Sequence, residues 1–282
     1  MRKILLAVVV ILSFISYAKP LEPSVHPVVR DIKKMAQSEK LHDHELSLDS
    51  IRKKIETNPE QAALAVVQEL KEKKSSPKEI SLYLWVLGTI KSTAHVDEIM
   101  KIVSENEDED IFRAACWSLT EIGGNKAEDF LIGILKQTND PVRQYDVLDN
   151  LARMKSIQAL PFTIEILRKD PAEYYWQSIF VFGKYGDTGI PFLLQHIADE
   201  DQNVRMATIV LLGQWLNAQE AVLPLQEQYW KEKDSMVRAN ILASLESANP
   251  DMDDIVSFSK KVSEKEKDPD VLQFARETVA SA

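Results

Sequence analysis

Apolar residues recur at helical spacing along most of the chain, in blocks of about 10 to 15 residues separated by short polar breaks. Neither hairpin dipeptide, Asn-Gly or Asp-Gly, occurs anywhere. Apolar and polar residues also fail to alternate as they do in half-buried strands. The pattern therefore predicts an all-α fold.

The helical blocks repeat along the chain. An aspartate opens six of them at intervals of 30 to 34 residues: Asp110, Asp140, Asp170, Asp201, Asp234 and Asp268. At an N-cap, an aspartate accepts hydrogen bonds from the first-turn amides and stabilises the helix by about 1 kcal/mol. Proline follows three of these aspartates and suits the first helical position. The period thus predicts repeats that each begin at an acidic cap.

A second apolar stretch with an early proline follows in three of the units. These stretches are Leu160-Pro161-Phe162, Ile190-Pro191-Phe192 and Leu223-Pro224-Leu225. Short breaks precede the second helices, and glycines such as Gly186 suit the left-handed residue that ends a helix. Each unit is therefore predicted to be a pair of helices.

The Asp-x-x-Val-Arg opening, the Gly-Asp break and the Ile-Pro-Phe-Leu-Leu second helix resemble HEAT repeats over about residues 77–280. They are most similar to the short HEAT-like class also found in phycobilisome lyases. The resemblance implies a right-handed α-solenoid, a HEAT/ARM-like superhelix of about six antiparallel helix pairs.

The resemblance also implies a structural ladder between helix-start aspartates and the arginines of neighbouring repeats. The implied ladder residues are Asp110, Arg113, Asp140, Arg143, Asp201, Arg205, Asp234 and Arg238. One repeat departs from the pattern, because Glu173 stands where the arginine belongs.

The N-terminus has the pattern of a secretory signal. A basic start precedes the apolar run Ile4–Ile15, and Ser16-Tyr17-Ala18 resembles a cleavage site. We expect residues 1–18 to be a signal peptide, with an uncleaved membrane helix as the alternative. The mature protein is then periplasmic or secreted, with no stable membrane insertion. We expect a flexible lead or loosely docked cap over residues 19–46, in which Val28–Ala36 can form a short helix, and the solenoid over 47–282.

Composition restricts the partners. The chain holds 34 basic and 44 acidic side chains, a formal net charge of −10, which argues against nucleic acid and against anionic lipid surfaces. Its one cysteine, Cys116, cannot form an internal disulfide and lies in an apolar stretch, as a buried structural cysteine does.

No catalytic constellation is apparent, and no cofactor is expected. Neither a Gly-x-Ser-x-Gly turn nor a glycine-rich phosphate loop occurs, and the acidic run 105–110 lacks the glycine of a calcium loop. The most metal-like group is His42-Asp43-His44-Glu45, whose spacing does not match a His-x-x-x-His helix face. We interpret it as a solvated polar segment.

Candidate partner-binding residues come from two features. Aligning the second helices on their prolines stacks Glu165, Gln195 and Gln228 in one row, expected to face solvent, beside His196 and Tyr229. Separately, Tyr174, Tyr175 and Trp176 open the helix of the repeat that lacks its arginine, and an exposed aromatic patch there is the second candidate surface. Trp117 and Trp215 have core-like spacing and are expected to be packing residues.

These features predict a non-catalytic scaffold or adaptor that holds another protein or peptide in the cell envelope. A small-ligand or metal carrier and a lyase-type enzyme are the alternatives. The oligomeric state stays open.

Overall fold

The structure is a computed structural model that describes residues 25–38, 41–169 and 171–281, without the side chains of 41–47. Over these ranges the regular structure is entirely helical, which confirms the predicted all-α class. The chain forms two compact units, Met1–Ala114 and Ala115–Ala282. The predicted signal peptide lies outside the described residues, and the predicted domain boundaries stay predictions.

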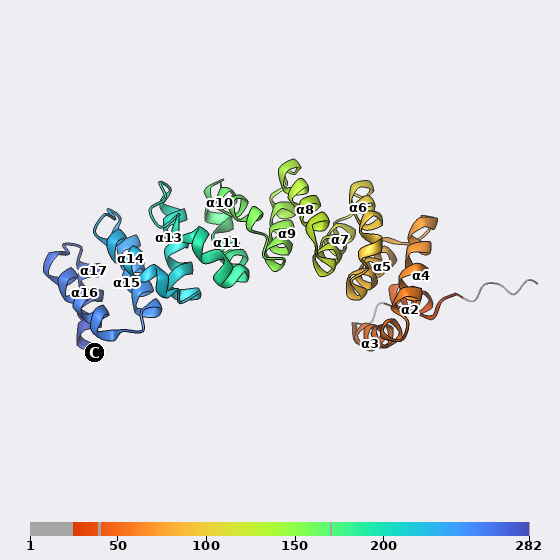
Figure 1. Ribbon diagram of the computed structural model, residues 1–282, viewed down its shortest axis with the longest axis horizontal. Coiled ribbons are helices and arrows are strands. Elements are labelled where there is room, and N and C mark those ends of the chain that lie inside the picture. Colours follow the sequence, from red (N-terminus) through yellow and green to blue (C-terminus); the bar gives the residue numbers. More distant parts are fainter. Residues whose placement is uncertain (1–24, 39–40, 170, 282) are drawn as a thin grey trace, which may run out of the picture. The chain divides into compact units, whose positions relative to one another are not determined.

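The first unit packs helices of the N-terminal third in sequence order (red to yellow in Figure 1). They are α2 (Pro27–Gln37), α3 (Leu41–Thr57), α4 (Pro59–Glu72), α5 (Pro77–Ile90), α6 (Val96–Glu105) and the start of α7 (Glu109–Ile122). The predicted capping box at the start of α5 is present, with the Ser76 amide donating to the Glu79 carboxylate at 2.7 Å.

Helix α2 replaces part of the flexible lead that the sequence predicts over residues 19–46. Val28, Val29, Ile32 and Met35 are all buried, and α2 packs against α3, α4 and α5. Four buried apolar side chains contribute roughly 6–12 kcal/mol of gross burial, an upper bound that outweighs the disfavouring effect of the nearby prolines. The alternative of a short helix over Val28–Ala36 is the one the structure adopts.

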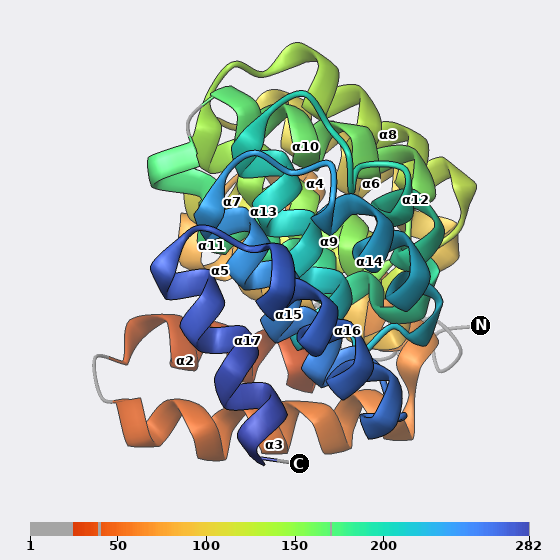
Figure 2. The same ribbon diagram turned by 90° about the vertical axis from the view of Figure 1, so that its left-hand side faces the viewer.

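The second unit continues the helix pairs. Its helices are α8 (Asn125–Gln137), α9 (Pro141–Arg153), α10 (Leu160–Lys169), α11 (Pro171–Tyr185), α12 (Ile190–Leu194), α13 (Gln202–Val210), α14 (Val222–Tyr229), α15 (Ser235–Ala248), α16 (Met252–Lys265) and α17 (Pro269–Ser281). In Figure 2, α11, α15 and α17 lie toward one side of this unit and α12, α14 and α16 toward the other, so first and second helices form separate layers.

Acidic caps begin the first helices as the period predicts. Asp140, Asp201, Asp234 and Asp268 each accept first-turn amides of α9, α13, α15 and α17. Asp110 does not: α7 begins two residues earlier than predicted, and Asp108 accepts the amides of Asp110 and Ile111 at 3.0 and 3.1 Å. The acidic run contains several carboxylates, and Asp108, the residue directly before α7, forms the N-cap.

A continuous apolar core runs between the layers of the second unit. Four residues past the arginine of each repeat lie Val147, Ile209 and Leu242, which are buried. Trp117, at the equivalent position of α7, is only half-buried. Cys116 is fully buried, which confirms its structural interpretation. No helix in the described part of the chain is long and apolar enough to cross a membrane.

Two helices of the second unit pack closely where α13 continues into a π-helical turn, Leu211–Trp215. There, Gly213 faces α15 so tightly that an ideal Cβ on it would lie 2.1 Å from the Cβ of Ser244. The Ser244 hydroxyl donates to the Ile209 carbonyl at 3.0 Å. The missing side chain of Gly213 therefore sets the distance between these two helices.

We predict that Gly213→Ala lowers the free energy of unfolding by about 1–3 kcal/mol, because the added methyl overpacks the contact with Ser244. Gly133→Ala is the matched control: no atom lies within 4 Å of its Cβ position inside α8, so it should stabilise by about 0.5–1 kcal/mol. Urea denaturation followed by circular dichroism measures both. Equal effects of the two substitutions would contradict the packing account.

Candidate partner-binding surface

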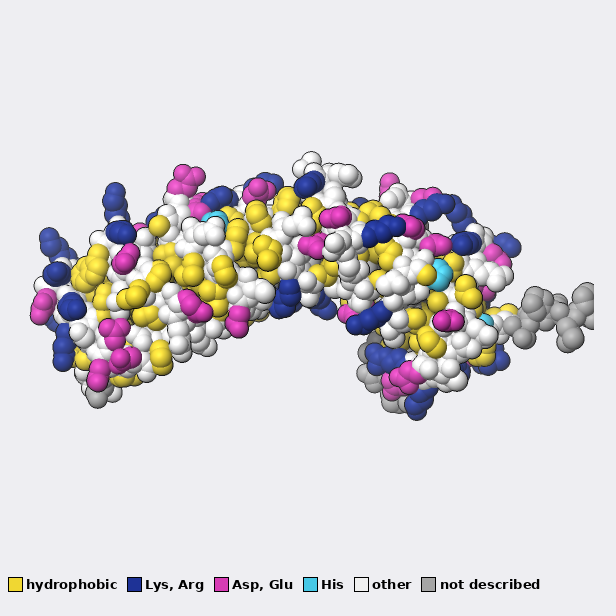
Figure 3. Space-filling view, in the orientation of Figure 1, with side chains coloured by type: hydrophobic (Ala, Val, Ile, Leu, Met, Phe, Trp, Pro, Cys, Tyr) yellow, Lys and Arg dark blue, Asp and Glu magenta, His cyan; other side chains and the backbone are white. Residues whose placement is uncertain are grey.

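Three aromatic side chains of neighbouring first helices stand exposed in the second unit. Trp176 and Phe180 of α11 are 59% and 51% exposed, and Trp215 of the π-helical turn is 42% exposed. The rings of Phe180 and Trp215 meet edge to face at 5.5 Å. We call these three residues the aromatic surface. Figure 3 shows hydrophobic side chains gathered over the part of this unit that α11 and α13 occupy in Figure 1.

Local geometry places these rings together. Trp176 and Phe180 are four residues apart and so lie on one face of α11. Gly183, one turn further, has no side chain, and the indole of Trp215 lies 3.5 Å from the position of its missing Cβ. The π-helical turn ends at Trp215, and such turns are frequent at functional sites.

Charged groups border the aromatic surface at the end of α11. Lys184 pairs with Asp149 of α9, and Arg153 lies 3.2 Å from the same carboxylate. Burial lowers the pKa of Lys184. An apolar centre beside a charged border is the usual composition of a protein interface.

The predicted tyrosines lie beside this surface and contribute less of it. Tyr175 is half-buried and packs edge to face on Trp176 at 5.4 Å, and burial raises its pKa. Tyr174 is also half-buried. Trp215 was expected in the core. It is exposed instead because the π-helical turn rotates it out of the buried stripe, an effect that helical periodicity does not show.

The second-helix row is only partly at the surface. Glu165 and Gln195 are exposed and His196 is half-buried, so their predicted role stays a prediction. Gln228 and Tyr229 are only 7% and 2% exposed, which contradicts their placement on an accessible face. The Gln228 amide donates to Glu232 at 3.2 Å, and the Tyr229 hydroxyl donates to Glu266 at 2.5 Å.

These two glutamates belong to a ladder that differs from the expected one. Arg205 donates to both carboxylate oxygens of Glu232, at 2.8 and 3.2 Å. Arg238 does the same to Glu266, at 2.9 and 3.0 Å. Both carboxylates are almost fully buried. We call these pairs the arginine–glutamate clamps. The cap aspartates therefore serve their own helices, and each of these arginines bonds a glutamate of the next repeat.

Each clamp also orders the turn before the next helix. Glu232 accepts the amides of Lys233 and Asp234, at 2.9 and 3.1 Å, so the residue that holds the arginine also fixes the cap residue. Arg238 in turn donates to the Lys233 carbonyl at 2.9 Å. A bidentate arginine is required for this geometry, because lysine lacks the planar fork.

The repeat with Glu173 in place of arginine has a substitute. Arg168 of α10 lies 2.5 Å from Asp199, which accepts the amide of the next cap residue, Asp201, at 3.0 Å. Asp199 thus occupies the place that Glu232 has one repeat later. Arg143 and Arg113 also have interaction partners. Asp140 caps α9 as predicted.

Nothing in the described part of the chain forms a metal-binding group of three His, Cys, Asp or Glu side chains. The side chains of His42, Asp43, His44 and Glu45 lie outside that part, although their backbone belongs to α3.

The model of HEAT repeats matches residues 63–152 and 160–246, more than half of the chain. The chain belongs to the HEAT repeat family. No curated protein matches it. Among solved structures, it is similar to a chain from the complex of CpcE and CpcF of phycocyanin lyase from Nostoc sp. PCC7120. That similarity has 17% identity and a TM-score of 0.41, over 78% of this chain and 94% of that chain.

The Arg238–Glu266 clamp makes the free energy of unfolding depend on pH in the acidic range. Burial alone would raise the pKa of Glu266, but the hydrogen bonds from Arg238, Tyr229 and two backbone amides lower it to about 2. A depressed carboxyl pKa contributes stability that is complete above the unfolded value of about 4.3 and is lost as pH falls toward 2. The contribution is on the order of 3 kcal/mol.

We predict that Glu266→Gln lowers the free energy of unfolding at pH 7 and flattens its decline between about pH 4.5 and 2. Urea denaturation across that pH range measures the effect. Glu264→Gln, at an exposed position two residues earlier in the last turn of α16, serves as the control. A wild-type decline that persists unchanged in Glu266→Gln would rule out this carboxylate as the cause.

Proposed function

We propose that this HEAT-repeat protein is a non-catalytic scaffold that binds another protein through the aromatic surface. The observation that carries the proposal is the exposure of Trp176, Phe180 and Trp215 side by side on packed helices. Exposed tryptophans are enriched among residues that dominate binding energy, and a contiguous exposed apolar patch marks an interaction site.

The expected affinity is moderate. Three aromatic side chains of this size, each about half exposed, present roughly 300 Å² of apolar surface. Covering that area contributes about 7 kcal/mol before the costs of association, which offset much of it. A protein partner that adds polar contacts at the Lys184–Asp149 border supplies the remainder.

Repeat architecture supports a binding role over a chemical one. Stacked helix pairs present extended surfaces in which each pair contacts only its neighbours, and such folds serve many unrelated interactions. The buried carboxylates of Glu232 and Glu266 serve the clamps, and that of Asp199 pairs with Arg168, so each of them holds one repeat to the next.

We further propose that the protein acts as an adaptor in the cell envelope after export. The support is the N-terminal sequence alone: a basic start, a short apolar run and small residues before Lys19. The negative net charge accords with a protein partner in place of nucleic acid.

We predict that replacing Trp176, Phe180 and Trp215 together with serine reduces capture of the native partner at least tenfold, because the apolar centre of the interface is removed. Photo-crosslinking from position 177, followed by mass spectrometry, identifies the captured protein in cell extracts. Leu223→Ser is the matched control, since Leu223 is 70% exposed on α14, away from the aromatic surface. Equal capture by the triple variant and the control would refute the proposal.

We predict that expression in a bacterial host with a secretory pathway yields a processed protein that begins at Lys19, since Ser16-Tyr17-Ala18 fits the cleavage pattern. Intact-mass measurement of the periplasmic fraction tests this. Ala18→Arg should block processing, and Ala36→Arg leaves the cleavage pattern untouched as the control. Unprocessed protein that stays in the cytoplasm would refute export.

A further inference from the structure

A long groove lies in the first unit between the second helices α4 and α6. One part, of about 830 Å³, is lined by residues 70–80 on one side and 102–111 on the other. A second part, of about 520 Å³, continues along the same helices and shares Leu70, Lys73, Ile102 and Glu105 with the first. Pockets that hold ligands have about 300–1,000 Å³, so each part is large enough to take side chains of a partner.

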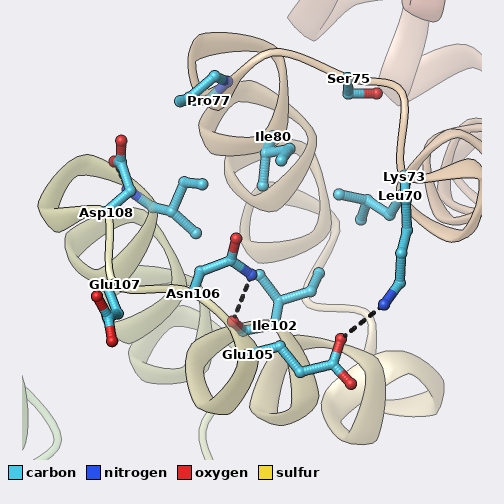
Figure 4. A pocket seen from close by; sticks show the side chains of 11 residues that line it. Leu70, Lys73, Ser75, Pro77, Ile80, Ile102, Glu105, Asn106, Glu107 and Asp108 are labelled. Carbon is cyan, nitrogen blue, oxygen red and sulfur yellow. Dashed lines mark hydrogen bonds and ion pairs between the residues drawn. The ribbon is translucent and has the colours of Figure 1, made fainter.

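The floor of the groove is apolar. Leu70, Ile80 and Ile102 point into it in Figure 4, from α4, α5 and α6. All three are half-buried, so their apolar surface is not fully covered within this unit. A large aliphatic side chain inserted between them would remove that surface from water.

The two walls carry opposite charge. On the α4 wall the charged side chains are Lys71 and Lys73. The facing wall carries the carboxylates Asp97, Glu98, Glu105, Glu107 and Asp108, with Lys101 as its one cation. Residues 105–108 of the acidic run thus form part of one side of a groove whose other side is basic.

Two ion pairs now cross the groove. Lys73 lies 3.1 Å from Glu105 and Lys71 lies 3.6 Å from Glu98. Both lysines are mostly exposed, and exposed pairs of this kind contribute little to stability, about 0–1 kcal/mol. A ligand that offers both charges can therefore replace these pairs at small cost.

We propose that this groove binds an extended segment of another protein that carries one large aliphatic side chain beside an acidic and a basic side chain. The aliphatic side chain covers Leu70, Ile80 and Ile102. The acidic group pairs with Lys71 or Lys73, and the basic group with Glu98 or Glu105. This site is separate from the aromatic surface, which lies in the other unit.

The test uses the full chain and four fluorescein-labelled ten-residue peptides. One combines a central leucine with two glutamates and two lysines. The second replaces leucine with serine, and the third and fourth carry only lysines or only glutamates as charged residues. Fluorescence anisotropy should show the first peptide binding at least tenfold more tightly than the others, with affinity that falls as salt rises.

Two variants locate the binding. Lys73→Glu, an exposed change, should weaken the first peptide about tenfold by reversing part of the basic wall. Ile102→Trp should abolish binding by filling the floor that both parts share. Lys260→Glu, an exposed change on α16 of the second unit, should have no effect. Unchanged melting temperatures establish that the variants are folded.

Equal binding of all four peptides, or a preference for the all-lysine peptide, would overturn the two-wall assignment. Binding that survives both Lys73→Glu and Ile102→Trp would place the peptide elsewhere and overturn the site. The triple serine variant of the aromatic surface leaves the residues of the groove unchanged. Loss of partner capture in that variant can therefore be told apart from loss of peptide binding in the groove variants.

Discussion

A single helix pair that has apolar residues on two faces cannot bury both faces by itself. The second unit is stable because each pair buries one apolar face of its neighbour. Val147, Ile209 and Leu242 occupy equivalent buried positions in the first helices α9, α13 and α15. The gross gain from burying such residues, about 1.5–3 kcal/mol each, accumulates only when the pairs stack. Apolar burial is not directional, however, and does not by itself fix the position of one repeat along the next. A directional interaction has to set this register.

The arginine–glutamate clamps are this directional interaction. Arg205 and Arg238 reach forward into the turn of the following repeat, where Glu232 and Glu266 also bind the amides of the next caps. A buried bidentate pair has one good geometry, and removing one partner leaves an uncompensated charge. Stacking, capping and register are thereby coupled at one place in each of these repeats. Where Glu173 interrupts the series, Arg168 and Asp199 restore the same connection from a different helix.

Rigid stacking has a functional consequence. Side chains that the core does not require, such as Trp176 and Phe180, are held on packed helices and lose little conformational freedom when a partner covers them. In the first unit, the long charged side chains between α4 and α6 leave the floor of a groove partly uncovered. The two units thus offer different chemistry, one an aromatic surface and the other a groove with walls of opposite charge.

The sequence by itself determined the repeat. Periodic apolar residues and recurring aspartates are local signals, because a helix and its cap are set by residues within a few positions of each other, as at Asp140, Asp201 and Asp234. Tertiary structure decided what depends on residues about 30 positions apart. The partner of Arg238 is Glu266 and not a cap aspartate. Gln228 and Tyr229 are buried and bonded to Glu232 and Glu266, and Trp215 is exposed at the end of a π-helical turn. Spacing along one chain cannot reveal these outcomes, because each follows from how closely two helices approach.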